Sequence, residues 1–427
     1  MAWGRKALLV TAAAALAGTA TAQPANRGGP VATYWMSAAT ATGFGAGAQA
    51  GARPSMGQIM GMMNGGGGNV AKTLTLQLGS SRRPTGEPQA DHLPPPSLGA
   101  GQQLPLLTPR AAPPAPQTPY VPHEYQKPKG RMLIFWGCGE RARPGQPLVL
   151  DFAQMAEGKL PPGMQNLSQM FVSSQTPPAP GRTTTYGEWP NERTRINVPA
   201  NGSLVGEHVV RGNYSPEIKF ALGQNQDFMG PFNLTTNRKN PSGSGQLGWA
   251  PVQGAKAYHA VMMGGGENDT VVMWSSSEVQ AMAMLPDYLS DGEISRLVTQ
   301  KALMAPTTTS CAIPKEALDA SPSGMVQMAA YGGEANFSYP PRPAKPPAGW
   351  APEWVAKVRY KSTTGAILGM DMADMGGGGD DEGGRPRPGA RPRPGQPSQG
   401  GRPAQQQPPR RPGLGDVIRG GLGLPGL

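Results

Sequence analysis

Methionines are the residues whose type and spacing in this sequence most clearly suggest chemistry. Two clusters each adjoin a run of glycines, namely Met56, Met60, Met62 and Met63, and Met370, Met372 and Met375. Thioether sulfurs are soft ligands that select Cu(I), so the first cluster is a candidate copper site. The alternative, which we favour, is that these adaptable side chains pack in an irregular core or lie in loops.

Acid–base chemistry has fewer candidates. The histidines stand singly in the sequence, as His92, His123, His208 and His259. We expect the first two to be solvated in a proline-rich segment, the third to be a surface residue rather than a general base, and the last to be half-exposed. Among the carboxylates, Glu188 and Asp151 are those to look for beside a cleft, where paired acids would serve a hydrolase.

The recognised catalytic motifs do not occur in the sequence. It holds no G-x-S-x-G elbow, no H-E-x-x-H helix and no Walker loop. Residues 43–48 match G-x-G-x-x-A, but no predicted strand and helix frame them, so they do not predict a nucleotide site. The sequence therefore favours a binding or structural role over catalysis.

The first 22 residues have the pattern of a secretory signal peptide. Arg5 and Lys6 precede an apolar run over residues 7–18, and residues 20–22 form an A-x-A cleavage signal. No later stretch reaches the roughly 20 apolar residues of a membrane helix. We therefore expect an exported protein, in the periplasm or at the cell surface, with no transmembrane helix in its mature chain.

The chain contains two cysteines, Cys138 and Cys311. In an exported protein a lone pair of cysteines predicts a single disulfide. Two buried free thiols are the alternative, because neither position has the spacing of a metal site or of a nucleophile.

Positive charge is concentrated in the C-terminal tail. Of the formal net charge of +11, residues 1–22 carry +2 and residues 385–427 carry +7, which leaves +2 for the rest. This nearly neutral body lacks the basic face that nucleic-acid binding requires. The tail from Arg385 to Arg411 either holds an anionic envelope polymer or serves as a solubilising spacer.

Short strands separated by turn residues dominate the rest of the chain. Between residues 31 and 240, alternation such as that of Leu74, Leu76 and Leu78, and the apolar run 131–138, predict the strands of a first β-sandwich domain. A proline-rich insertion over residues 82–129 interrupts this domain, and we expect it to be disordered.

A second domain is predicted over residues 245–340. A tryptophan closes one strand and a tyrosine opens the next after a turn, at Trp249, Pro251, Gly254 and Tyr258. With a possible hairpin over residues 325–338, this stretch resembles a fibronectin type III domain, which is an immunoglobulin-like β-sandwich. The resemblance implies two packed sheets and no particular function.

Three further segments complete the organisation of the chain. A helix is predicted over residues 290–304, because Ser290 is a suitable N-cap and Glu293 completes a capping box. Residues 341–362 combine a proline-rich connection with alternating apolar and basic residues, which predicts a half-exposed edge strand. Repeats of glycine, proline and arginine over residues 376–427 predict a disordered tail.

The sequence therefore predicts a mainly β protein with two β-sandwich domains of immunoglobulin or fibronectin type III kind, one inserted helix and long disordered segments. We expect a non-catalytic protein of the cell envelope that binds a protein or an envelope polysaccharide. The alternatives are a periplasmic Cu(I)-binding protein and a hydrolase whose acidic residues are assembled only in space.

Overall fold

The computed structural model describes residues 29–43, 70–110, 129–159, 172–194, 198–280 and 285–369. All of them belong to one compact unit, residues 1–379. Within these ranges strands far outnumber helices, which confirms a mainly β protein. The signal-peptide segment, both methionine clusters, His123 and the tail lie outside the described residues. No helix within the described ranges is long and apolar enough to cross a membrane.

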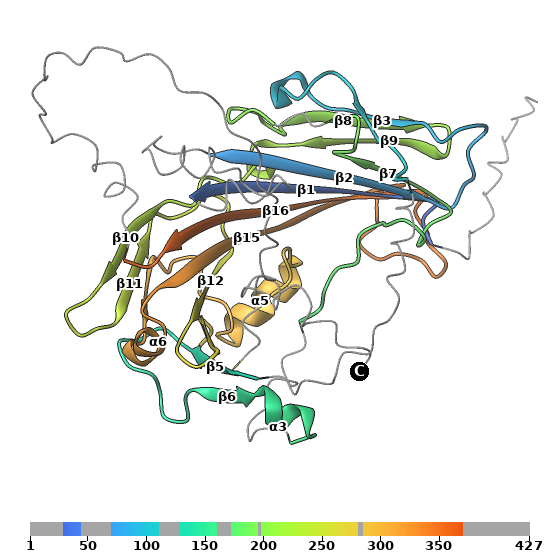
Figure 1. Cartoon of the computed structure of the whole chain (residues 1–427). Coiled ribbons are helices and arrows are strands. Elements are labelled where there is room, and N and C mark those ends of the chain that lie inside the picture. The colour runs from blue at the N-terminus through green and yellow to red at the C-terminus, as the bar shows by residue number, and fades with distance from the viewer. Residues whose placement is uncertain are drawn as a thin grey trace, which may run out of the picture. The chain divides into compact units, whose positions relative to one another are not determined.

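A nine-stranded sheet forms the centre of the fold, in the order β6-β5-β13-β12-β15-β16-β1-β2-β7 (Figure 1). Its strands are β1 (Ala32–Gly43), β2 (Ala71–Ser80), β5 (Arg131–Trp136), β6 (Leu148–Asp151), β7 (Thr185–Trp189), β12 (Ala257–Gly265), β13 (Thr270–Ser275), β15 (Gly324–Tyr339) and β16 (Trp354–Ile367). The pairs β1–β16 and β5–β13 are parallel, and the others are antiparallel.

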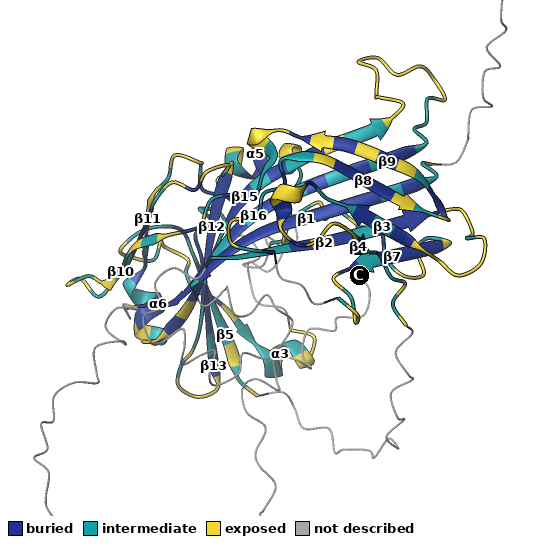
Figure 2. Cartoon of the chain, turned by 90° about the horizontal axis from the view of Figure 1, so that it is seen from above, coloured by how far each residue is buried: buried dark blue, intermediate teal, exposed yellow. Residues whose placement is uncertain are grey.

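Two smaller sheets cover one face of the nine-stranded sheet. One has the order β4-β3-β8-β9 and the other the order β10-β11-β14. Their strands are β3 (Ala90–Leu93), β4 (Leu104–Pro105), β8 (Gly206–Gly212), β9 (Ser215–Leu222), β10 (Leu234–Lys239), β11 (Gly245–Trp249) and β14 (Ser310–Ile313). Figure 2 shows buried and exposed residues alternating along β9, as expected of a strand with one face on a core and one in solvent.

The main core lies between these sheets. Tyr34, Met36 and Val358 of the large sheet pack in the same cluster as Val210 and Phe220 of the four-stranded sheet. Towards the other end of the large sheet, Trp274 and Met262 share this cluster with residues of the three-stranded sheet and of the short helix α6 (Lys315–Ala320). The strands thus expose one apolar face each to a common interior.

Helix α5 (Asp291–Thr299) packs against the opposite face of the large sheet. Ser290 is its N-cap and accepts a hydrogen bond from the backbone of Glu293, as predicted. Ile294 and Leu297 are buried with Tyr331 of β15. The helix ends five residues before the predicted Met304, because Lys301 adopts a positive φ of 58°, which breaks the helix. The other short helices are α3 (Phe152–Ala156), η1 (Pro96–Leu98) and η2 (Gln224–Gln226).

Strand pairing crosses the predicted boundary between two sandwich domains. The large sheet places β1, from the N-terminal part of the chain, beside β16, and β5 beside β13. Within residues 245–340, β11 and β14 lie in one sheet while β12, β13 and β15 lie in the large one. Alternation in a sequence reports which residues share a strand face, but not which strands pair, so it did not reveal this mixed sheet.

The proline-rich insertion is ordered over its first part, contrary to expectation. Residues 82–110 include β3, η1 and β4, and they bury Leu98 and Leu104 completely. Pro96 occupies the first turn of η1, where no backbone N–H is needed, and Pro105 ends a strand. Residues 111–128 lie outside the described residues.

Strand β16 is not the edge strand that its basic residues predict. It pairs with β1 on one side and with β15 on the other. Lysine and arginine usually discourage further pairing at an edge. Here their charges lie on one face of an interior strand, where aromatic rings and carboxylates accommodate them, as described below.

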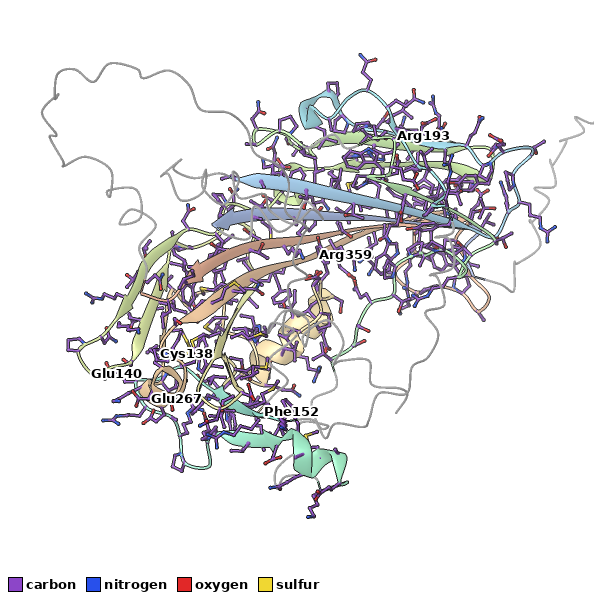
Figure 3. The ribbon with its side chains drawn as sticks, in the orientation of Figure 1. Cys138, Glu140, Phe152, Arg193, Glu267 and Arg359 are labelled. Atoms are coloured by element: carbon purple, nitrogen blue, oxygen red, sulfur yellow. A yellow bond between two sulfur atoms is a disulfide. The ribbon has the colours of Figure 1, made fainter. Side chains whose placement is uncertain are left out.

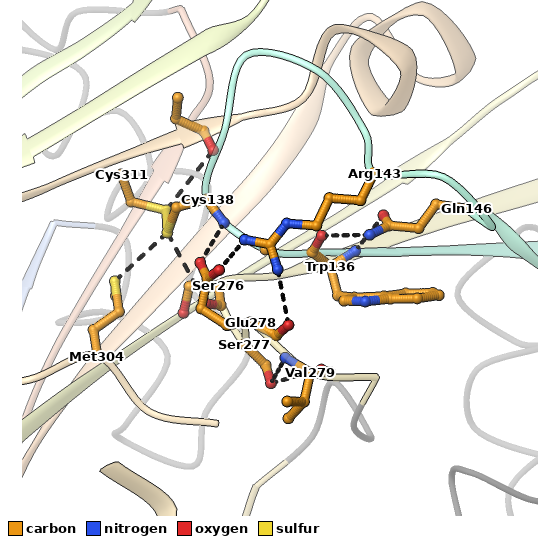
Figure 4. Close-up of polar contacts among 12 residues, drawn as sticks. Trp136, Cys138, Arg143, Gln146, Ser276, Ser277, Glu278, Val279, Met304 and Cys311 are labelled. Carbon is orange, nitrogen blue, oxygen red and sulfur yellow. Dashed lines mark hydrogen bonds and ion pairs between the residues drawn. A yellow bond between two sulfur atoms is a disulfide. The ribbon is translucent and has the colours of Figure 1, made fainter. Parts of the chain in front are cut away.

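The two cysteines form a disulfide, with their Cα atoms 5.1 Å apart. Cys138 follows β5 in the large sheet and Cys311 lies on β14, so the bond joins the large sheet to the three-stranded sheet. Figure 4 shows its surroundings, in which Glu278 accepts a hydrogen bond from the backbone of Cys138 and pairs with Arg143.

Candidate functional site

A row of polar and aromatic side chains crosses five strands of the large sheet on its α5 side. The strand registers place Glu188, Gln77, Trp35, Lys357 and Asn336 side by side on β7, β2, β1, β16 and β15. We call these five residues the polar row. Side chains alternate between the two faces of a strand, so the neighbours of these residues point into the main core instead. One face of the sheet therefore packs on the main core, and the other face carries the polar row from β7 to β15.

Next to the polar row, Arg359 is held between two aromatic rings. Its guanidinium carbon lies 4.8 Å from the ring centre of Trp35 and 4.4 Å from that of Tyr288. Its Nε donates a hydrogen bond of 2.7 Å to the hydroxyl of Ser37. Tyr288 lies three residues before the start of α5, and Figure 3 labels Arg359 on the stretch of sheet beside this helix. Burial lowers the pKa of Arg359.

Two lysines on the same face of β16 are paired with acids. Lys357 lies 2.7 Å from Glu334, and Lys361 lies 3.0 Å from Asp287. Burial raises the pKa of the Glu334 carboxyl, but hydrogen bonds from its neighbours, led by Lys357, outweigh burial and hold that pKa below its usual value. This part of the face is a network of charges fixed in place by the fold.

A cavity of about 390 Å³ opens at the β7 end of the polar row. Its lining combines three carboxylates, two guanidinium groups, an amide and apolar carbon, from Glu87, Glu188, Glu192, Arg110, Arg193, Asn191, Thr108, Leu107, Pro88 and Pro109. Most small-ligand sites are predominantly apolar with a few fixed polar groups, whereas this lining is mostly polar and therefore suits a polar ligand. We call it the β7 pocket.

The fold holds Glu188 rigidly in the β7 pocket. Its backbone exchanges two hydrogen bonds, of 3.1 and 2.9 Å, with that of Leu107. The hydroxyl of Tyr186 donates to one oxygen of its carboxylate at 2.6 Å. No described residue donates to the other oxygen, which is therefore free to accept from a ligand. The amide of Asn191 donates to the carbonyl oxygens of Pro105 and Glu188, which fixes the adjoining turn.

The structure separates the two carboxylates that the sequence singled out. Glu188 lines a cavity, as expected of an acid beside a cleft. Asp151 instead caps α3, where its carboxylate accepts hydrogen bonds from the backbones of Ala153 and Gln154, both at 3.0 Å. The two acids therefore do not form a pair.

The described histidines are all buried, which corrects the expectation that they contact solvent. His92 and His208 have no exposed surface, and His259 is 5% exposed. Residues two apart in a strand share one face, and His92 lies two residues from the buried Ala90 while His208 lies two residues from the buried Val210. This spacing could have predicted that both histidines are buried.

Two of these histidines link the large sheet to the four-stranded sheet. The Nε2 of His208 lies 2.7 Å from the carbonyl oxygen of Leu204 and must donate to it. In a neutral ring its Nδ1 then accepts from the Nε2 of His92, at 3.1 Å. The Nδ1 of His92 accepts in turn from the hydroxyl of Tyr34, at 2.9 Å. We call this chain of hydrogen bonds the histidine link.

Burial keeps the histidine link uncharged. It lowers the pKa of His92 well below its ordinary value, with a further contribution from His208, and it lowers the pKa of His208 as well. The link has a structural role, because both rings are enclosed and each of their nitrogens is already hydrogen-bonded.

Metal-ligating residues do not gather within the described ranges. No group of three or more histidines, cysteines, aspartates and glutamates there could hold a metal ion. The candidate copper ligands Met56, Met60, Met62 and Met63 lie outside the described residues, so that site stays a prediction.

Comparison with known proteins adds no family: no protein-family model, curated protein or solved structure matches this chain.

Proposed function

We propose that this protein is a non-catalytic, exported component of the cell envelope that binds an envelope polysaccharide in the β7 pocket. The observation that carries the proposal is Glu188, which lines the cavity, is held by three hydrogen bonds and has one carboxylate oxygen that accepts from no described residue. The disulfide supports export, because such bonds persist in oxidising compartments such as the periplasm.

The lining of the β7 pocket suits a ligand rich in hydroxyl groups. Its carboxylates accept hydrogen bonds, while the guanidinium groups of Arg110 and Arg193 offer donors. Leu107 and Pro109 supply apolar carbon against which the C–H face of a sugar ring can lie. The volume of about 390 Å³ falls within the range of about 300–1,000 Å³ found for small-ligand sites.

Removing the charge of Glu188 is expected to weaken polysaccharide binding. A hydrogen bond to a charged group contributes about 1.5–3 kcal/mol, so Glu188→Gln should lower affinity roughly 10- to 150-fold. Isothermal titration of the mature protein with fragments of purified envelope polysaccharide measures this change.

A matched control lies on the four-stranded sheet. Arg211 and Glu217 form an exposed ion pair of 2.8 Å between β8 and β9, away from the cavity lining. Glu217→Gln removes the same charge and should bind the fragments as the wild type does. Equal affinities of wild type and Glu188→Gln for the fragments would contradict the proposal that the β7 pocket is the binding site.

A hydrolase is the second candidate, because Glu188 shares its cavity with Glu87 and Glu192. Glycosidases act through such pairs of carboxylates. Incubation of the same fragments with the wild type decides between the two functions. New reducing ends that Glu188→Gln no longer releases would establish hydrolysis, whereas binding with no new reducing ends would support the proposal.

The copper alternative concerns a different part of the chain. Titration of the purified protein with Cu(I) under reducing conditions tests it. Binding weaker than about micromolar would end this alternative, since soft thioether sites in a dedicated cluster are expected to hold the ion more tightly.

A further inference from the structure

Arg359 is positively charged, and no described carboxylate forms an ion pair with it. The two acids whose charges act on it, Asp287 and Glu334, lie within ion-pair distance of Lys361 and Lys357 instead. This face of β16 therefore has three cationic side chains and two carboxylates. Transferring a charge out of water is unfavourable unless a partner compensates it, so a bound anion would stabilise the half-buried guanidinium, which has no ion-pair partner of its own among the described residues.

The guanidinium is also oriented for a ligand. The rings of Trp35 and Tyr288 hold it from two sides, and Ser37 takes its Nε–H. No described acceptor takes the hydrogens of its two terminal nitrogens. A planar fork of N–H donors fits the two oxygens of a carboxylate, phosphate or sulfate. Because the rings restrict the side chain before binding, less conformational entropy is lost when an anion arrives.

We propose that Arg359 is the centre of an anion-binding site, flanked on β16 by Lys357 and Lys361, for a carboxylate, phosphate or sulfate group. The three side chains lie on one strand face at spacings of roughly 7 Å. The two lysines are each paired with an acid, so the guanidinium of Arg359 carries the one unpaired positive charge of this group. The chemistry is shared by a charged envelope polymer, a free anion and a lipid headgroup.

This site goes beyond the proposed function and is separate from the β7 pocket. Glu188 and Lys357 belong to the same polar row, but three strand spacings, roughly 14 Å, separate them. A neutral sugar in the pocket would not need Arg359. An extended anionic polymer, in contrast, would be able to reach both sites.

Binding of simple anions tests the proposal. Calorimetric titrations with sodium phosphate, sodium sulfate and sodium glucuronate, each against sodium chloride at equal ionic strength, should show saturable binding of at least one oxyanion. Arg359→Gln should weaken this binding about tenfold or more, because it removes the charge and the fork together. Arg359→Lys keeps the charge and loses the fork, so it should bind more weakly than wild type but more tightly than Arg359→Gln.

The control is Arg211→Gln, which removes an exposed arginine of β8 and should bind the anions as wild type does. Co-sedimentation with phosphatidylglycerol vesicles, against phosphatidylcholine vesicles, separates the sources of the anion. Binding to the anionic vesicles that Arg359→Gln loses points to a headgroup at this site, because the arginine-rich tail is the same in both proteins. Binding to free anions alone points to a soluble or polymer-borne group.

Two results would overturn the proposal. One is a wild type that binds neither the oxyanions nor the anionic vesicles. The other is a folded Arg359→Gln protein that binds them as tightly as wild type does. If Arg359→Gln does not fold, the wild-type titrations and Arg359→Lys still decide the question. Glu188→Gln should keep its anion binding, so a failure of this site is distinguishable from a failure of the β7 pocket.

Discussion

Acidification is expected to destabilise the protein strongly below about pH 6.5. His92, His208 and His259 are buried, and burial lowers the pKa of each, that of His259 to about 4. As the pH falls, the unfolded chain therefore binds protons at these histidines at a higher pH than the native protein does. The contribution to stability is complete above the unfolded pKa of about 6.5 and is lost as the pH falls through the lower native values.

His259 alone sets the scale of this effect. With a native pKa of about 4, its protonation should lower the free energy of unfolding by about 3 kcal/mol between pH 7 and pH 4. The histidine link adds to this in the same direction. Urea unfolding at a series of pH values measures the total.

The variant His259→Leu separates this titration from the others. The structure shows no hydrogen bond from its imidazole to another described residue, so the change leaves no described partner unsatisfied. The loss of stability between pH 7 and pH 4 should shrink by about 3 kcal/mol relative to wild type. The account would be wrong if wild type were equally stable at pH 4 and pH 7, or if His259→Leu kept the full pH dependence.

Removing the disulfide is expected to have the second large effect. Cys138 and Cys311 are 173 residues apart, and a cross-link over so long a loop restricts the unfolded chain by up to about 5 kcal/mol. The double variant Cys138→Ala, Cys311→Ala should therefore unfold at a much lower urea concentration, with unfolding that a reductant no longer affects.

The reductant provides the control for this prediction. Wild type in the presence of a reductant should approach the stability of the double variant, since both lose the same cross-link. If oxidised and reduced wild type unfold at the same urea concentration, the bond does not restrict the unfolded chain in the way the loop length implies.

Several strands could be predicted from their residues alone. The alternation of Leu74, Leu76 and Leu78 marks β2, and the apolar run from Arg131 marks β5, because one or both faces of these strands are buried. The N-cap Ser290 marks the start of α5 for an equally local reason. Such features depend on interactions within a few residues, which a sequence displays directly.

The arrangement of the strands could not be predicted in this way. β1 pairs with β16, more than 300 residues later in the chain, and nothing in either strand specifies its partner. The basic residues of β16 predict an exposed edge, because the groups that enclose them, Trp35, Tyr288 and Glu334, come from distant segments and leave no local signal. Long-range packing of this kind decides burial without leaving a local signal.

The same limit applies to the candidate sites. The sequence marks Glu188 as an acid to look for beside a cleft, but its cavity also needs residues 87–88, 107–110 and 191–193, which the fold brings together. Nothing in the sequence around Arg359 distinguishes it as a candidate site. It has no ion-pair partner because the nearby carboxylates pair with Lys357 and Lys361, which only the fold reveals.

Hydrogen exchange of the protein, with and without fragments of envelope polysaccharide, tests the central claim most directly. The account predicts that the ligand slows amide exchange in residues 107–110, 188 and 191–193, which line the β7 pocket, and leaves exchange in β8 and β9 unchanged. Protection confined to other elements, or no protection at saturating ligand, would contradict it.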